Sequence, residues 1–375
     1  MEDASGSPNL TNAGTHFALG EGEDFYSIWD RAAMGQPVYR FPKTQDGWLV
    51  AWNTLAVTLH LLIPRTLGGT DPGPNPATLV SMRWRSRGKA AGSNTTPIEA
   101  ARTSAGSAAH DEIDWRSYDE VAAEYAAVHD PRTTVVAKDL VEITPVHAEA
   151  RVLDVGTGTG VGARAAAEAA GPGGLVVGVD PSLPMLRAAA AAGSHGAAAE
   201  AIDLPFRAAT FDVVLSLFVL SHLHRLDTAL FDMLRVLRSG GRAGVTAWGP
   251  SDDDFSQAWT EVAERHAEHE ILADAYDQAM PWARKLQDPN VLKNVLHDAG
   301  LRDIRIERRE YRFEMTTEDY LVGKETAATG RFLRSMLDDD PWQRFRQETS
   351  EVFAERFPPT FHDFRDVILA SGHKP

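Results

Sequence analysis

The residues best suited to chemistry lie where three glycines follow a carboxylate. The stretch RVLDVGTGTGVG covers residues 151–162. Asp154 lies within the end of its apolar run, and Gly156, Gly158 and Gly160 follow at every second position. Because glycine tolerates positive φ and has no side chain, a ligand can lie close to this backbone. The alanine-rich segment behind it favours a helix, whose N-terminus offers unpaired N–H groups and partial positive charge. The pattern therefore predicts a strand, a glycine turn and a helix around a ligand.

Further acids stand at the ends of the next predicted strands. Asp180 follows the apolar run Gly174–Val179. An acid about 20 residues past the last glycine can accept hydrogen bonds from both hydroxyls of an adenosine ribose. Asp203 and Leu204 follow a third predicted strand, and a fourth begins with FDVV at Phe211. A glycine turn alone suits NAD as well as other nucleotides, so these acids are needed to indicate which ligand binds.

Together these motifs resemble those of the class I S-adenosylmethionine (SAM)-dependent methyltransferases. The shared pattern is D-x-G-x-G-x-G from Asp154, then Asp180, then Asp203-Leu204, then FDVV. Within the family the chain is most similar to the small-molecule branch related to the ubiquinone/menaquinone C-methyltransferases (methyltransferase type 11), over roughly residues 113–375. The resemblance implies an α/β fold: a Rossmann-like, seven-stranded, mostly parallel sheet with helices on both faces and a helical lid. It also implies methyl transfer from SAM to a small acceptor.

The resemblance assigns expected roles to individual residues. Asp154 orients the loop, or meets the ammonium group of the cofactor through water. Asp180 holds the ribose hydroxyls, and Met185 lines the adenine. Asp203 accepts the adenine amino group, while the Leu204 N–H meets the ring. The expected cofactor-binding residues are Asp154, Gly156, Thr157, Gly158, Gly160, Asp180, Pro181, Met185, Asp203, Leu204, Ser216 and Tyr125.

His222, in LSHLH after the fourth strand, is the candidate catalytic residue. Methyl transfer is an in-line displacement, for which alignment of the reactants supplies on the order of 7–11 kcal/mol. A nitrogen or carbon nucleophile needs little else, whereas an alcohol or phenol benefits from a general base. Lining of the substrate pocket and a structural hydrogen bond are the other roles open to His222. No metal site is expected, since His266 and His269 lack the H-E-x-x-H pattern and predict a solvated helix face.

Alternating strand and helix patterns supply the frame for these residues. Strands are expected at 151–155, 174–179, 197–201, 211–217, 242–248, 304–313 and 366–372. In the family the last strand runs antiparallel between the fifth and sixth. Helices are expected at 162–170, 182–192, 227–237 and 289–299. An aromatic stripe from Trp115 to Tyr125 predicts a further helix, either packed on the core or closing over the site as in the family. Another helix is expected at 134–143.

Composition limits the class of protein. The chain has 375 residues, of which 43% are hydrophobic, and no cysteine. Disulfides, thiolate zinc sites and a cysteine nucleophile are therefore excluded, which fits a reducing cytoplasm. Acids and bases balance in residues 1–110, so the net charge of −16 lies on the remainder and disfavours a nucleic-acid substrate. The apolar run Trp48–Ile63 is shorter than the ~20 residues that span a bilayer, so no membrane span is expected.

The chain divides into two expected parts. Residues 1–110 are expected to be a largely irregular N-terminal extension ending in a Gly/Ala/Ser-rich linker. Its residues 23–85 contain several aromatic side chains, so this portion is either a small appended structure or an extension without a stable fold. Residues 111–375 form the methyltransferase domain, with helical lid insertions at about 251–286 and 316–357. Basic residues such as Arg331 and Arg334 alternate with acids and predict pairs on helix faces.

Three other functions remain open. An enzyme of the same fold could act on tRNA or protein, although the acidic charge disfavours this. A dinucleotide-binding oxidoreductase would share the glycine turn, but Asp154 and Asp203-Leu204 argue against it. A non-catalytic SAM-binding or interaction protein could use residues 23–85 as its partner surface. The three acids at the strand ends favour retention of cofactor binding.

Overall fold

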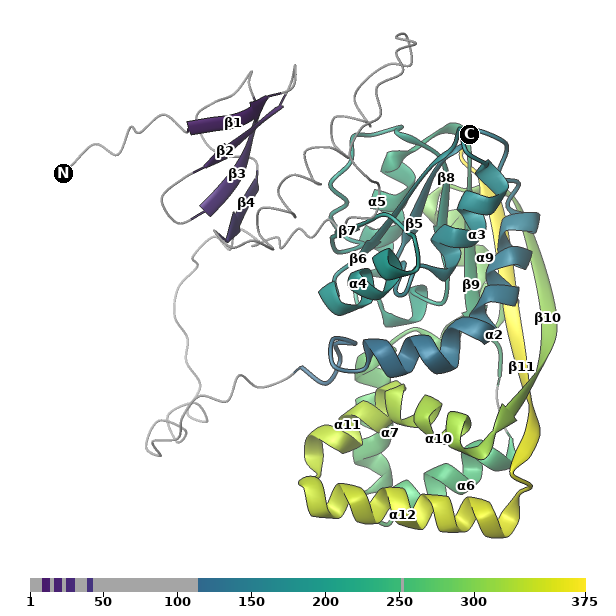
Figure 1. Cartoon of the computed structure of the whole chain (residues 1–375). Coiled ribbons are helices and arrows are strands. Elements are labelled where there is room, and N and C mark those ends of the chain that lie inside the picture. Colours follow the sequence, from purple (N-terminus) through teal and green to yellow (C-terminus); the bar gives the residue numbers. More distant parts are fainter. Residues whose placement is uncertain (1–8, 14–16, 22–24, 31–38, 43–113, 251–252) are drawn as a thin grey trace, which may run out of the picture.

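The computed structural model describes residues 9–13, 17–21, 25–30, 39–42, 114–250 and 253–375 (Figure 1). The N-terminal ranges are strands that pair antiparallel in chain order: β1 (Asn9–Ala13), β2 (Phe17–Glu21), β3 (Phe25–Asp30) and β4 (Tyr39–Pro42). Part of the N-terminal extension is therefore regular. The predicted linker lies outside the described residues, and the expectation that the extension is largely irregular stays a prediction.

A seven-stranded sheet lies at the centre of the larger unit, in the order β10-β11-β9-β8-β5-β6-β7. Its strands are β5 (Arg151–Val155), β6 (Leu175–Asp180), β7 (Gly196–Ala198), β8 (Phe211–Ser216), β9 (Leu237–Trp248), β10 (Arg302–Thr316) and β11 (Thr360–His373). The five neighbouring strands β9, β8, β5, β6 and β7 pair in parallel. β11 is antiparallel to both of its neighbours, β9 and β10. This confirms the predicted Rossmann-like sheet, with the last strand between the fifth and sixth.

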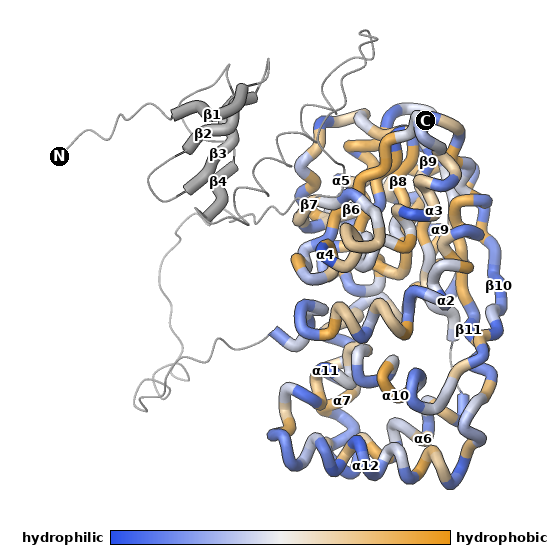
Figure 2. The backbone as a smooth tube through the Cα atoms, viewed as in Figure 1, coloured by the Kyte–Doolittle hydropathy of each residue, from blue (hydrophilic) through white to orange (hydrophobic). Residues whose placement is uncertain are grey.

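Helices cover both faces of the sheet. The two faces alternate along each strand: Val152 and Val213 join the core under α2 and α3, whereas Leu153 and Val214 join the core under α5 and α9. The helices are α2 (Ala122–Ile143), α3 (Val161–Ala170), α4 (Leu183–Ala191), α5 (Leu226–Val236) and α9 (Pro289–Ala299). Figure 2 shows that the central strands are mostly hydrophobic, while the outer helices carry hydrophilic residues.

The helix before the sheet differs from the prediction. The sequence predicted an aromatic helix from Trp115 and a separate helix from Thr134, but α2 is one 22-residue helix that continues through Pro131. Residues 114–121, hereafter the strap, form turns before it. In the strap the Ser117 hydroxyl accepts the Asp119 N–H at 3.1 Å, the local side-chain bond that competes with a helix.

Two further boundaries moved. β7 ends at Ala198 rather than at residue 201, and β9 begins at Leu237 rather than at residue 242, so that Gly240 lies inside a strand. The pairing of β8 with β9 shifts register between Phe211 and Val213, and Gly240 takes a φ of +74° there. This irregular stretch explains why the strand was expected to begin only at residue 242. None of the helices in the described ranges is long and apolar enough to cross a membrane.

The predicted insertions supply a helical layer below the sheet in the view of Figure 1. It consists of α6 (Asp254–Ala263), α7 (His269–Ala279), α10 (Thr317–Thr326), α11 (Ala328–Met336) and α12 (Asp339–Arg356), hereafter the lid. The lid has its own buried core, which includes Trp259, Tyr320, Leu333, Phe345 and Phe353. The short α8 (Ala283–Leu286) packs instead against α9 and β9. The long β10–β11 pair connects the sheet to the lid.

Candidate active site

The glycine turn between β5 and α3 adopts left-handed backbone at all three glycines. The φ angles are +70° at Gly156, +52° at Gly158 and +86° at Gly160, values that side chains disfavour. A Cβ at Gly156 would lie 2.3 Å from Val219 Cγ2, so this glycine permits close packing. A Cβ at Gly158 would meet nothing within 4 Å, so the Gly158 backbone faces open space. The turn therefore has one position at which a ligand can approach bare backbone.

Asp180 lies at the end of β6, directly against this turn. Its Oδ2 accepts the Gly158 N–H at 2.9 Å, and its Oδ1 accepts the Ser182 N–H at 2.9 Å. Burial, together with the charge of Asp119 in the strap, raises the pKa of Asp180 to about 6, against the hydrogen bonds from Ser182 and Gly158. The acid expected to hold the ribose thus lies beside the open glycine.

Asp154 lies beneath the turn and is 1% exposed. Its Oδ2 accepts the Thr157 hydroxyl at 2.7 Å, whereas its Oδ1 has no hydrogen-bond partner among the described residues. Burial raises the pKa of Asp154 to about 6, against the hydrogen bonds from Thr157 and Ala163. An unpaired buried carboxylate oxygen is costly, so this atom fits a site for a cationic or hydrogen-bond-donating ligand group.

Helix α2 fixes the far end of the turn, an arrangement that sequence analysis missed. Asp130 accepts the Thr159 hydroxyl at 2.5 Å and pairs with Arg164 at 3.0 Å. Arg164 also donates to the Thr159 carbonyl at 2.7 Å. Asp130 comes to the loop only because α2 packs on α3, so no local pattern in the sequence could have revealed it.

The expectation for the Leu204 N–H is wrong. Leu204 is 2% exposed, and its N–H already donates to Asp232 Oδ2 at 2.6 Å, while Arg235 binds its carbonyl at 2.9 Å. Asp203 is exposed; limited burial and the charge of Asp232 raise its pKa, and Arg235 opposes this. The first acid after β7 is Glu200. Asp203 was predicted to be the acid after this strand, because β7 was expected to continue to residue 201.

Two other residues predicted to bind the cofactor, Met185 and Ser216, are buried and make hydrogen bonds within the protein. Met185 is 3% exposed, and its N–H donates to Ser182, the N-cap of α4. Ser216 is fully buried and donates to the Val155 carbonyl at 3.0 Å, which joins the ends of β8 and β5. Pro181 is exposed directly after Asp180. These contacts stabilise the edge of the sheet on which the glycine turn lies.

His222 belongs to an aromatic cluster formed by Tyr118, Tyr125, His129 and His222. The His222 ring lies edge-on to Tyr118 at 6.0 Å between centroids, Tyr118 meets Tyr125 at 5.4 Å, and Tyr125 stacks on His129 at 4.2 Å. Burial and the charge of Arg331 together lower the pKa of His222 to about 4, against an opposing effect of the Ala279 backbone. His222 is therefore neutral at pH 7, and one of its ring nitrogens is able to accept a proton.

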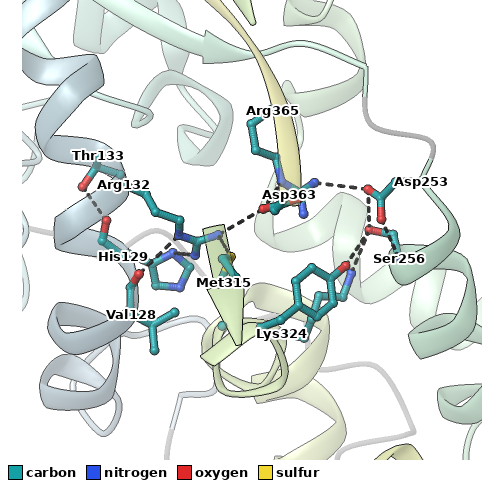
Figure 3. A network of polar contacts seen from close by, with 12 residues as sticks. Val128, His129, Arg132, Thr133, Asp253, Ser256, Met315, Lys324, Asp363 and Arg365 are labelled. Carbon is teal, nitrogen blue, oxygen red and sulfur yellow. Dashed lines mark hydrogen bonds and ion pairs between the residues drawn. The ribbon is translucent and has the colours of Figure 1, made fainter. Parts of the chain in front are cut away.

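A polar network joins α2 to β11 and the lid (Figure 3). Asp363 accepts Arg132 at 3.3 Å and Arg365 at 2.8 Å, and Arg365 also reaches Asp253 at 3.4 Å. Lys324 donates to the Ser256 hydroxyl at 3.5 Å, and burial lowers its pKa to about 8. These bonds fix the lid relative to α2.

The basic residues of α11 behave differently from one another. Arg334 pairs with Asp339 at 2.7 Å, as predicted for a helix face. Arg331 is 6% exposed and has no carboxylate within salt-bridge distance among the described residues, so the predicted surface pair is wrong there. In the lid, His266 pairs with Glu348 at 3.2 Å. The described ranges hold no group of three residues suited to a metal ion.

Comparison with known proteins adds a family match. Residues 153–245 match the model of the methyltransferase domain family. The chain is 28% identical over 221 residues to nocamycin O-methyltransferase from Saccharothrix syringae, covering 55% of this chain and 78% of that protein. It is 30% identical over 97 residues to tRNA (carboxymethyluridine(34)-5-O)-methyltransferase from Arabidopsis thaliana, covering 24% of each. A structure of Haemonchus contortus phosphoethanolamine N-methyltransferase 2 with S-adenosyl-L-methionine gives a TM-score of 0.41 at 18% identity, covering 68% of this chain and 57% of that one.

The strand order, the glycine turn with its two acids and the family match define a class I methyltransferase domain. The protein is a SAM-dependent methyltransferase, and its cofactor is S-adenosylmethionine.

Proposed function

We propose that the enzyme transfers the methyl group of SAM to a small, partly apolar organic acceptor by in-line displacement. The observation that carries the proposal is the open backbone at Gly158, whose N–H binds Asp180 beside the buried, unpaired Oδ1 of Asp154. An adenosyl amino acid offers the hydroxyls and the cationic ammonium group that suit these two carboxylates.

Each residue of the turn has a separate task. Asp180 binds the ribose hydroxyls while it keeps Gly158 in place. Asp154 orients the turn through Thr157, and its buried Oδ1 meets the ammonium group through water. SAM supplies a methyl group on a sulfonium centre, a strong electrophile. The protein then contributes mainly alignment and exclusion of water.

His222 is the proposed proton acceptor for an alcohol or phenol. It is neutral at pH 7, because burial and the charge of Arg331 lower its pKa to about 4. Tyr118 lies against its ring and limits the orientations that the imidazole can adopt. A base in this state can take the acceptor proton as the oxygen–carbon bond forms, which contributes on the order of 10²–10⁴ in rate.

A small acceptor is supported by the surroundings of His222. Aromatic rings from the strap and α2 lie on one side, and the lid has an apolar core. The similarity to nocamycin O-methyltransferase, over most of that protein's length, agrees with this class of acceptor. The acidity of residues 111–375 opposes binding of a phosphate backbone. The same acidity and the lack of cysteine agree with a cytoplasmic enzyme.

A tRNA acceptor is the alternative, favoured by the match to the Arabidopsis tRNA methyltransferase. That match covers about a quarter of each chain, whereas the nocamycin O-methyltransferase match covers 55% of this one. The small-molecule acceptor therefore has the wider support.

The test begins with calorimetric titration of the full chain with SAM, S-adenosylhomocysteine (SAH) and NAD. Micromolar binding of SAM and SAH, near −8 kcal/mol, is expected, with no binding of NAD. Radiolabelled SAM is then offered with a panel of phenols, alcohols and amines, and separately with bulk tRNA. Label transferred only to tRNA would refute the proposed acceptor class, and binding of NAD alone would refute the assignment of the site.

A further inference from the structure

The strap is attached to the lid rather than to the sheet. Its internal hydrogen bonds are local, such as Ser117 N–H to the Asp114 carbonyl at 2.8 Å. Among the described residues, the hydrogen bonds that join the strap to elements other than α2 go to Arg331 on α11 and to Gln278 on α7. The position of the strap thus depends on a few contacts with two lid helices.

Arg331 makes most of these contacts. Its Nε donates to the Trp115 carbonyl at 3.0 Å and its Nη2 to the Arg116 carbonyl at 3.3 Å, while Nη1 donates to Thr326 in its own helical layer. Its guanidinium carbon lies 3.8 Å from the centre of the Tyr118 ring. A planar fork of donors suits this combination of carbonyls and an aromatic face, and a lysine cannot reproduce it. The buried cation is therefore satisfied by the strap instead of by an acid.

The strap in turn borders both sides of the candidate active site. On the acceptor side, Tyr118 lies against His222. On the cofactor side, Tyr118 meets Tyr125, an expected cofactor-binding residue, at 5.4 Å between ring centroids. The charge of Asp119 also raises the pKa of Asp180. The Trp115 ring meets Phe332 of α11 at 5.0 Å, so the opposite side of the strap is packed on the lid.

We propose that Arg331 is a positioning residue that couples the lid to the cofactor site by holding the strap in place. With Arg331 bound to the strap, Tyr118 stays against His222 and against Tyr125, an expected cofactor-binding residue. Without these bonds the strap retains only its local turns and opens more often, so SAM and SAH leave faster. The inference rests on the proposed function, because it assumes that the turn beside Asp180 binds the cofactor.

The test compares Arg331→Gln with Arg334→Gln in the full chain. The two arginines lie on the same helix, but Arg334 is exposed. It binds Leu337 and Asp339 and lies over the Trp342 ring at 5.8 Å, all within the lid. SAH affinity is measured by calorimetry and SAH dissociation by stopped-flow tryptophan fluorescence. Trypsin cleavage after Arg116, whose side chain is 43% exposed, is followed by mass spectrometry. These readouts separate a positioning role from a general loss of stability.

For Arg331→Gln we expect roughly tenfold weaker SAH binding, the loss expected for one charge-assisted hydrogen bond. Dissociation should be faster, and cleavage after Arg116 should accelerate. Arg331→Lys should behave like the glutamine variant, because it keeps the charge but not the fork. Arg334→Gln should match the wild type within about twofold, the range usual for a surface change.

A second variant guards against unfolding of the Arg331 variants. Trp115→Ala removes the ring contact with Phe332 from the partly exposed strap and leaves Arg331 in place, and it should also speed SAH dissociation. Unchanged SAH affinity and dissociation in Arg331→Gln, with faster cleavage after Arg116, would reduce Arg331 to a structural anchor and overturn the inference. Absence of SAH binding by the wild type would instead overturn the proposed function, and the inference with it.

Discussion

Replacing Asp154 with asparagine should stabilise the cofactor-free protein at alkaline pH while weakening SAM binding. The carboxylate is 1% exposed, its Oδ1 has no partner among the described residues, and burial raises its pKa to about 6. An ionised group that the fold disfavours in this way reduces stability. The same charge is the proposed partner of the cofactor's ammonium group, so the two effects of the substitution oppose each other.

The magnitude follows from the pKa. An unfolded aspartate titrates near 3.9, so a shift of roughly two units makes ionised Asp154 cost the folded state about 3 kcal/mol. This cost is fully present above pH ~6 and mostly disappears as pH falls towards ~4, below which Asp154 is protonated in both states. The wild type gains stability over that window. Asparagine cannot ionise, but its buried amide group costs about 1–3 kcal/mol if it finds no partner. The net gain at pH 8 is therefore about 0–2 kcal/mol.

The assay is urea unfolding of the full chain without cofactor at several pH values between 8 and 4. The stability difference between Asp154→Asn and the wild type should move by about 3 kcal/mol across that range, against the variant as pH falls. Asp227→Asn, an exposed carboxylate on α5, is the matched control and should show no such slope. At pH 8, SAM affinity of Asp154→Asn should fall at least tenfold. A stability difference independent of pH, or unaltered SAM binding, would refute the reasoning.

Three further predictions concern the same site. Gly158→Ala should cost about 1–2 kcal/mol because of its positive φ and weaken SAH at least tenfold by calorimetry, since the methyl group occupies the open space; unchanged affinity would mean that no ligand approaches there. Asp232→Ala should lower the free energy of unfolding in urea by about 2–4 kcal/mol, because the Leu204 N–H and Arg235 lose their partner. The control Asp203→Ala, at an exposed residue, should change this free energy by less than ~0.5 kcal/mol and SAH affinity by less than about twofold. His222→Gln should slow methylation of a phenol or alcohol by on the order of 10²–10⁴ at unchanged SAH affinity, and the wild-type rate should persist until pH falls towards about 4, where His222 becomes protonated; equal rates would leave His222 with a lining role.

The sequence predicted most of the sheet because its strands are short apolar runs separated by clear helix and turn signals. Strands β5, β6 and β8 were predicted within a residue or two at each end. The errors came where local signals conflict with distant partners. Gly240 falls in a stretch expected to precede a strand, but it lies within β9, where its N–H donates to the Lys374 carbonyl at 2.7 Å. The strap has aromatic residues at helical spacing, yet its turns are closed by Ser117 and held by Arg331.

The site shows the same division. Type and spacing alone indicated the glycines, Asp154 and Asp180, because a tight turn and a strand end are local features. Spacing could not reveal that Asp232 occupies the Leu204 N–H, since the partner lies on a helix 28 residues away. Nor could spacing reveal that Asp130 binds Thr159 and Arg164 at the end of the glycine turn.

By itself, the sequence determined a glycine turn between a strand and a helix, acids at the strand ends and alternating strands and helices, because these depend on backbone conformation and apolar periodicity along the chain. The resemblance of these motifs to a known family implied the SAM-dependent methyltransferase fold. The tertiary structure decided which polar groups remain available to a ligand. A carboxylate or guanidinium bonds to whatever packing brings within about 3 Å. Packing placed strap carbonyls within hydrogen-bond distance of Arg331, and Asp232 within hydrogen-bond distance of the Leu204 N–H. It left one oxygen of Asp154 without a hydrogen-bond partner among the described residues.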